Sequence, residues 1–272
     1  MRSLDPDMDP DVVSEIDARL ARVGAQHHVS IPWAIESGSR AWGFPSPDSD
    51  DDCRFLFVRP RADYASPWRR RDVIETPLDA VYDIGGWDLI KAVRLAVAGN
   101  ATVGEWLRSP LVYSGDADFR GDLLDLVERT ADRAAVARHY LHVGAQQWRR
   151  SGADDGDEVS LKQLFYALRP AATLPWMTGH ESSSPPMNLH QLLAEAPPER
   201  DVSEAVDQLV AAKRVSREIG KGLVPAPIRR FVIGELHGAE DRFPRFREPR
   251  AAAVREDAEA TFLRLVDRWA PA

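Results

Sequence analysis

Residues 36–54 read ESGSRAWGFPSPDSDDDCR, and the interpretation of the whole chain starts from this stretch. The segments 28–35 and 53–58, which flank it, are rich in apolar and β-branched residues, so two strands are predicted. A Gly-Ser turn ends the first strand, and a run of acids begins the second. Side chains alternate along a strand, which places Asp50 and Asp52 on one face and Asp51 on the other.

The residue types around this turn are those that a metal and a phosphate require. Carboxylates held close together repel each other, and a divalent cation removes that cost. Mg²⁺ prefers hard oxygen ligands and is usually held by one or two carboxylates together with substrate phosphates. Gly38 lets the backbone approach a phosphate with no Cβ in the way, and Ser39 offers a hydroxyl and an amide as donors. The stretch therefore predicts a magnesium and phosphate site on Gly38, Ser39, Asp50 and Asp52.

The acidic residues allow two other interpretations. Asp48, Asp50 and Asp52 match the beginning of a calcium-binding EF-hand loop, but Cys53 stands where the loop needs Gly and Arg59 where it needs Glu. An acidic turn, in which Asp and Ser side chains accept hydrogen bonds from local amides, stays open as the plain structural alternative.

The bulk composition limits the classes of function. The chain has 272 residues, 44% of them hydrophobic, which is enough for one large domain or two small ones. The net charge of −8 argues against a protein that coats duplex DNA. An arginine-rich C-terminal stretch suits either single-stranded nucleic acid or a solvated surface. Its members are Arg229, Arg230, Arg242, Arg245, Arg247 and Arg250, interleaved with Phe231, Phe243 and Phe246.

Hydrophobic periodicity predicts an α+β fold in two domains. Residues 11–23 have helical spacing, residues 28–35, 53–58, 72–75 and 79–84 are predicted strands, and a helix is predicted to follow Asp88. Beyond Tyr113 the pattern is helical, over 123–127, 134–148, 159–168, 202–219 and 251–269. We expect a small mixed sheet flanked by helices in residues 1–113, and an all-helical bundle in 114–272. Cys53, the single cysteine, is expected in the core. No segment is long and apolar enough to cross a membrane, which favours a cytoplasmic protein.

The motif G-S-R-A-x-G followed by S-D-x-D-x-R resembles the signature of the polymerase β nucleotidyltransferase superfamily, in particular its YcgL and RNA-ligase-associated (RlaP) group. The likeness continues through GGWDLIKAVRLAVAGN and EWLRSPLVY, within residues 85–113, and KQLFYALRP at 162–170. Much of residues 36–170 is therefore covered. The resemblance implies a nucleotidyltransferase that uses two Mg²⁺ ions, for which Mn²⁺ can substitute, and an NTP, with ATP favoured.

The resemblance also implies further site residues. A third carboxylate is expected on a neighbouring strand, and Asp83 is the choice because it alternates with apolar residues. Its rivals are Asp72, Glu75, Asp79 and Asp88, of which Asp88 also suits a helix cap. The resemblance brings six further positions into the site. Arg40 and Arg54 are expected to contact phosphate or pair with the aspartates, and Lys162 and Arg169 to contact phosphate. Tyr166 is expected to stack on the nucleobase or to make a hydroxyl contact, and Glu105 to act as a general base or to orient the acceptor. Lys162, Tyr166 and Arg169 share one face of a predicted helix, and a plain solvent-facing helix remains the alternative for them.

The predicted reaction is the transfer of a nucleoside monophosphate, AMP by preference, from an NTP to an acceptor hydroxyl or phosphate, with release of pyrophosphate. This is chemistry of the EC 2.7.7 type. The acceptor stays open between RNA, which the RNA-ligase-associated relatives and the C-terminal arginines favour, and a protein side chain or an antibiotic. Two alternatives belong to other classes: a module that senses a nucleotide without transfer, and an RNA-cleaving helical domain. The latter is based on Arg133 and His139, whose spacing resembles the R-x₄₋₆-H motif of HEPN nucleases.

Overall fold

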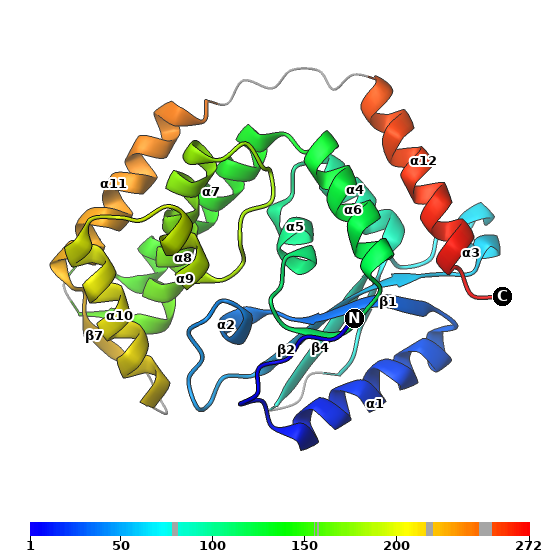
Figure 1. The fold of residues 1–272 in the computed structure, drawn as a ribbon, viewed down its shortest axis with the longest axis horizontal. Helices are drawn as coiled ribbons and strands as arrows, with labels where there is room; N and C mark the ends of the chain where they lie inside the picture. Colours follow the sequence, from blue (N-terminus) through cyan, green and yellow to red (C-terminus); the bar gives the residue numbers. More distant parts are fainter. Residues whose placement is uncertain (78–80, 155, 157, 216–219, 245–251) are drawn as a thin grey trace. The chain divides into compact units, whose positions relative to one another are not determined.

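The computed structural model describes residues 1–77, 81–154, 156, 158–215, 220–244 and 252–272 (Figure 1). The chain divides into two compact units. Unit 1 comprises Met1–Ala41, Asp50–Ala131 and the C-terminal segment that ends at Ala272, and unit 2 comprises Trp42–Ser49 and Asp132–Glu248. The division predicted at residues 113 and 114 cuts the sequence once, whereas each compact unit is assembled from separate segments.

Unit 1 is a five-stranded mixed sheet with helices on both faces. The strand order is β3-β4-β2-β1-β5, in which β2 and β4 are parallel and the other pairs are antiparallel. The strands are β1 (Ser30–Glu36), β2 (Asp51–Val58), β3 (Val73–Glu75), β4 (Tyr82–Asp88) and β5 (Val112–Gly115). The helices are α1 (Pro10–His27), α2 (Gly38–Ala41), α3 (Arg61–Ala65), α4 (Leu89–Val97), α5 (Ala101–Leu107), α6 (Ala117–Thr130) and α12 (Ala252–Trp269).

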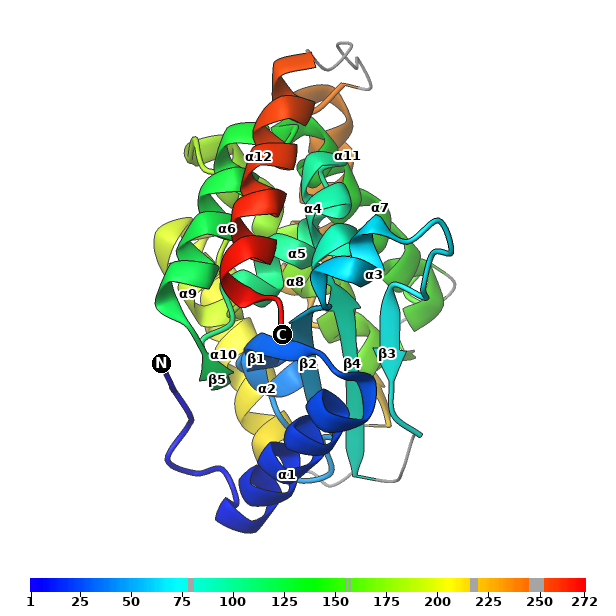
Figure 2. The ribbon, with the colours of Figure 1, turned by 90° about the vertical axis from the view of Figure 1, so that its right-hand side faces the viewer.

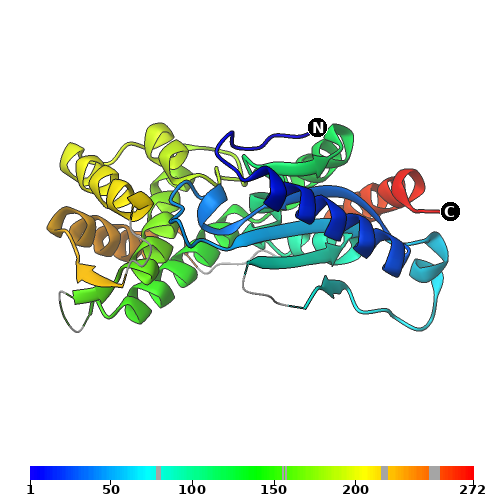
Figure 3. The same ribbon diagram turned by 90° about the horizontal axis from the view of Figure 1, so that it is seen from below.

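Helix α1 covers one face of this sheet (Figure 3). It begins with Asp9 as N-cap and Pro10 in its first turn, where a missing amide hydrogen costs nothing. The apolar residues predicted from their spacing are buried on its inner side, among them Ile16 and Leu20. They pack against alternate residues of the strands, including Cys53 and Phe55. Cys53 is therefore a buried core residue, as predicted.

Helices α4, α5, α6 and α12 cover the opposite face (Figure 2). Trp33 and Leu56 from the sheet join Leu123 of α6 and Leu265 of α12 in a second apolar cluster. Burial on the sheet explains why α6 and α12, which the sequence pattern assigned to the C-terminal domain, belong to unit 1. The strand β5 was not predicted, because the residues around Tyr113 are too few to show a clear alternation.

Unit 2 is mainly helical. Its helices are α7 (Arg133–Ser151), α8 (Leu161–Gly179), α9 (Leu189–Glu195), α10 (Arg200–Val215) and α11 (Ala226–Arg242). Two short strands, β6 (Glu158–Ser160) and β7 (Lys221–Leu223), form a separate antiparallel sheet that the sequence did not predict. Helix α8 continues past residue 168 through Pro170 and Pro175, because tertiary packing of its buried residues outweighs the local cost of proline.

The predicted α+β class, a mixed sheet flanked by helices with a helical C-terminal part, is confirmed. No helix within the described ranges has the length and the apolar character that a bilayer crossing needs.

Candidate active site

The Gly-Ser turn follows the end of β1 within unit 1, and its residues begin the short helix α2. Gly38 has a φ of +60°, and a Cβ built on it would lie 1.9 Å from Oδ2 of Asp52. The amide of Ser37 donates to the carbonyl of Asp52 at 2.8 Å, which ties the turn to the strand. Only glycine permits both this backbone conformation and this approach of the Asp52 carboxylate.

The three consecutive aspartates have different environments. Asp51 is buried on the face that carries α1, and its Oδ1 lies 3.0 Å from Nε of Arg40. Burial raises the pKa of Asp51, and Arg40 opposes this shift. Asp52 lies on the opposite face of β2, whereas Asp50 is exposed and precedes the first residue of the strand. Because Cys53–Val58 is strand, the EF-hand interpretation is wrong: its loop would have to continue through these residues.

Asp83 lies beside Asp52. The parallel strands β2 and β4 pair Asp52 with Asp83 in register, which places both side chains on the same face. Arg54 lies between the two: its Nη2 is 2.6 Å from Oδ2 of Asp83 and 3.4 Å from Oδ1 of Asp52. Its Nη1 donates to the carbonyl of Asp83 at 2.7 Å. The structure therefore brings together Asp52, Arg54 and Asp83, which the sequence had nominated.

The other described candidates for the third carboxylate form ion pairs or hydrogen bonds away from Asp52. Asp88 caps α4, as predicted, by accepting from the amide of Ile90 at 3.0 Å, and it also pairs with Arg59. Glu75 pairs with Arg71, and Asp72 lies 3.9 Å from Nζ of Lys91. Asp79 lies outside the described residues.

The carboxylates of Asp52 and Asp83 suit a divalent cation if the Arg54 side chain leaves the space between them. Among the described residues, no group of three or more His, Cys, Asp or Glu side chains is arranged to hold a metal, and Arg54 lies between the two carboxylates nearest to such an arrangement. Asp83 is partly exposed, and an ion pair at that exposure contributes at most about 1 kcal/mol. Two hard carboxylates against a glycine without Cβ are the chemistry that Mg²⁺ and a phosphate need, so the residues fit the implied ion.

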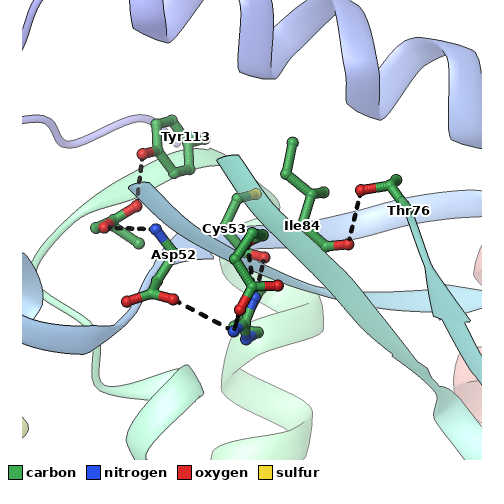
Figure 4. A network of polar contacts seen from close by, with 8 residues as sticks. Asp52, Cys53, Thr76, Ile84 and Tyr113 are labelled. Carbon is green, nitrogen blue, oxygen red and sulfur yellow. Dashed lines mark hydrogen bonds and ion pairs between the residues drawn. The ribbon is translucent and has the colours of Figure 1, made fainter. Parts of the chain in front are cut away.

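Glu36 supports this site from the opposite face, and sequence reasoning missed it. Its carboxylate is fully buried and accepts from the hydroxyl of Tyr113 at 2.6 Å and from the amide of Asp52 at 3.0 Å (Figure 4). Burial raises the pKa of Glu36 to about 8, although these two hydrogen bonds lower it. A glutamate at the end of an apolar strand was the signal available in the sequence.

In unit 2, two residues predicted to bind the nucleotide contact Trp42. The ring of Tyr166 meets Trp42 edge-on with centroids 4.9 Å apart, and the buried guanidinium of Arg169 lies 5.0 Å from the Trp42 ring centroid. Arg169 also donates to the carbonyl of Met187 at 2.7 Å. These contacts give Arg169 a packing role within unit 2, while Lys162 is exposed. Whether these three side chains bind a nucleotide stays a prediction, as it does for Ser39 and for Glu105, which lies on α5.

A second lysine of unit 2 was not predicted. Lys213 of α10 is buried, with Nζ 4.7 Å from the ring centroid of Phe44 and 4.9 Å from that of Phe165. Burial lowers the pKa of Lys213 to about 8, and the charge of Lys162 adds to this shift. No carboxylate partner for Lys213 occurs in the described part of the chain.

Contacts within unit 2 account for the other basic residues that the sequence singled out. Arg133 donates to the carbonyls of Met177 and His180, and His139 packs edge-on against Tyr140. Of the C-terminal arginines, Arg229 donates to the carbonyl of Ala153, and the other two that are described form ion pairs. These pairs are Arg230 with Glu199 and Asp201, and Arg242 with Glu235. Arg245, Arg247 and Arg250, together with Phe246, lie outside the described residues.

Comparison with known proteins gives three findings. The model of a family described as "RNA repair pathway DNA polymerase beta family" matches residues 12–261. The chain is 37% identical over 219 residues to the uncharacterized protein YcgL of Bacillus subtilis, covering 80% of this chain and 82% of that one. A solved nucleotidyltransferase-like protein from Exiguobacterium sibiricum aligns with 85% of this chain and 75% of its own, at 15% identity and a TM-score of 0.32, which is too low to bear on the fold.

Proposed function

The chain belongs to the RNA repair pathway DNA polymerase beta family, and we propose that it transfers a nucleoside monophosphate from an NTP to an acceptor hydroxyl or phosphate. One observation carries the proposal: the carboxylate of Asp52 lies against the Cβ-free face of Gly38 and in register with Asp83 on the neighbouring strand. This arrangement offers a place for phosphate beside a pair of hard ligands.

The residues of unit 1 have separable roles in this proposal. Gly38 and Ser39 bind a phosphate through backbone amides and the Ser39 hydroxyl. Asp52 and Asp83, with Asp50 joining from the residues before β2, hold Mg²⁺, which when bound neutralises charge on the attacking and leaving oxygens. Asp83 accepts the proton of the attacking hydroxyl, since its carboxylate is partly exposed. Arg54 leaves its place between the aspartates and pairs with a phosphate.

The donor and the acceptor are part of the proposal. We take ATP as the first donor to test and an RNA end as the first acceptor, because the family is described by an RNA repair pathway. Adenylylation of the RNA would then release pyrophosphate.

The test uses the full chain with labelled ATP, MgCl₂ or MnCl₂, and RNA oligonucleotides with 5′-phosphate, 5′-hydroxyl or 3′-hydroxyl ends. We expect label in the RNA and release of pyrophosphate, and loss of both in Asp52→Asn and Asp83→Asn with the fold retained by circular dichroism. The matched control is Asp125→Asn, an exposed carboxylate on α6, which should remain active. Full transfer by the Asp52 and Asp83 variants would show that these residues are not the metal ligands.

A nucleotide-sensing module is the second candidate, and the position of Arg54 favours it. An arginine that neutralises both carboxylates could be retained in a protein that binds an NTP without transfer. ATP binding without pyrophosphate release, over the full set of acceptors, would support the sensor.

A further inference from the structure

Unit 1 contains a cavity of about 480 Å³ at the opposite ends of β2 and β4 from Asp52 and Asp83. It is lined by Arg59, which follows β2, by Asp88, which ends β4, and by residues of α3, of the loop between α3 and β3 and of α4. We infer that this cavity binds single-stranded RNA, with a phosphate held by Arg69 and Arg94 and a base stacked on Trp68.

The carboxylates of the cavity are already neutralised. Asp88 accepts from Nε of Arg59 at 2.9 Å, from the hydroxyl of Tyr64 at 2.9 Å and from the amide of Ile90. Asp63 lies 2.9 Å from Nε of Arg70, and Asp72 lies 3.9 Å from Nζ of Lys91. Each of the three carboxylates therefore has a cationic partner already, and none remains to neutralise another arginine.

Arg69 and Arg94 also line the cavity, and both are exposed. Within the described ranges of the chain, neither has a carboxylate partner. As far as the described residues show, the cavity therefore carries two guanidinium groups without a carboxylate partner. Guanidinium groups bind phosphate oxygens through paired N–H donors, so a phosphate is the ligand that their charge and shape fit.

Trp68 is not itself a lining residue, but it lies between two residues that are. Its chain neighbours Pro67 and Arg69 both line the cavity, and its side chain is 82% exposed, although an indole of this size is usually buried. Proteins hold single-stranded nucleic acid with arginines that contact the phosphate backbone and with exposed aromatic rings, because every nucleobase has a flat face that can stack on such a ring. The stretch 67–71, PWRRR, supplies these groups consecutively.

The cavity is separate from the candidate active site. Asp83 and Asp88 are five residue steps apart along β4, which corresponds to roughly 16 Å at about 3.3 Å per residue. The cavity therefore lies at the other end of β4 from the Asp52 and Asp83 carboxylates, where an RNA strand can be anchored away from the reacting phosphates. The inference does not depend on the transfer reaction.

Fluorescence anisotropy of a labelled 12-nucleotide single-stranded RNA tests the inference with the full chain at several salt concentrations. We expect Arg69→Ala with Arg94→Ala to weaken binding about tenfold at low salt and to reduce the salt slope by about 0.7, since the two arginines hold one phosphate and each phosphate contact on a single strand contributes about 0.7. Trp68→Ala should weaken binding about fivefold or more with the slope unchanged.

The charge-matched control replaces Arg149 and Arg150, two exposed arginines at the end of α7, by alanine and should bind RNA like the parent. RNA binding is measured without ATP, so failure of this inference can be told apart from failure of the proposed transfer reaction. RNA binding by the Arg69/Arg94 variant equal to that of the control would overturn the inference. Binding of AMP at the same cavity as tightly as the oligonucleotide would overturn the assignment to RNA.

Discussion

Replacing Glu36 by Gln should remove a pH dependence from the stability of the protein. Glu36 is buried, and its pKa is raised from an ordinary 4.5 to about 8. Between these two values the folded chain binds more protons than the unfolded chain, so stability falls as the pH rises from 4.5 towards 8. Glutamine is neutral throughout and keeps an oxygen acceptor for the Asp52 amide and a second polar atom next to the Tyr113 hydroxyl.

The size of the effect follows from the shift. Each pKa unit corresponds to about 1.4 kcal/mol, so the cost of Glu36 at pH 7 is roughly 3 kcal/mol relative to pH values below 4.5. We expect Glu36→Gln to match the parent near pH 4.5 and to exceed its free energy of unfolding by roughly that amount at pH 7.

Urea unfolding monitored by circular dichroism between pH 4.5 and pH 8 measures this difference. Glu256→Gln, which replaces an exposed carboxylate on α12, controls for the change in net charge and should keep a constant offset from the parent. Parallel stability profiles for the parent and Glu36→Gln would refute the reasoning, because they would mean that Glu36 has the same proton affinity in the folded and unfolded chains.

Three further predictions concern single residues. Gly38→Ala should lower the melting temperature and abolish nucleotide transfer. The added Cβ would lie 1.9 Å from the Asp52 carboxylate, and a φ of +60° costs an alanine about 1–2 kcal/mol. Calorimetry measures the first effect and the transfer assay the second. Arg54→Ala should make the melting temperature rise more with MgCl₂ than it does in the parent, since Asp52 and Asp83 lose their cation; equal rises would contradict it. Lys213→Met should stabilise the fold at pH 7 by up to roughly 3 kcal/mol, because the pKa of Lys213 falls from 10.5 to about 8 on folding. Between pH 8 and pH 10.5 the unfolded chain binds more protons at Lys213 than the folded chain does, so the stability of the parent rises over that range. The stability difference between Lys213→Met and the parent, measured by urea unfolding, should therefore decrease as the pH rises from 8 to 10.5. A difference that persists at pH 10.5 would argue against burial of the charge as its cause.

The elements with strong periodicity were predictable from the sequence, and those stabilised by distant contacts were not. Helix α1 is indicated by Ile16 and Leu20 at helical spacing, and β2 by the run from Cys53 to Val58. Strand β5 is too short to show a period, and α8 passes through two prolines because its neighbours bury it. The grouping of α12 with the sheet is a contact between segments about 200 residues apart, for which no local pattern exists.

The sequence alone determined the local chemistry of the site. A glycine followed by a serine, and an acidic run that begins a strand, are short-range features that residue order shows directly. Asp50, expected on the same strand face as Asp52, instead precedes β2. Only the tertiary structure decided what surrounds them: that Asp83 is the acid in register with Asp52, that Arg54 lies between the two, and that Glu36 supports Asp52 from the buried face. Strand register and burial are set by packing between distant segments, so residue order within one segment does not encode them.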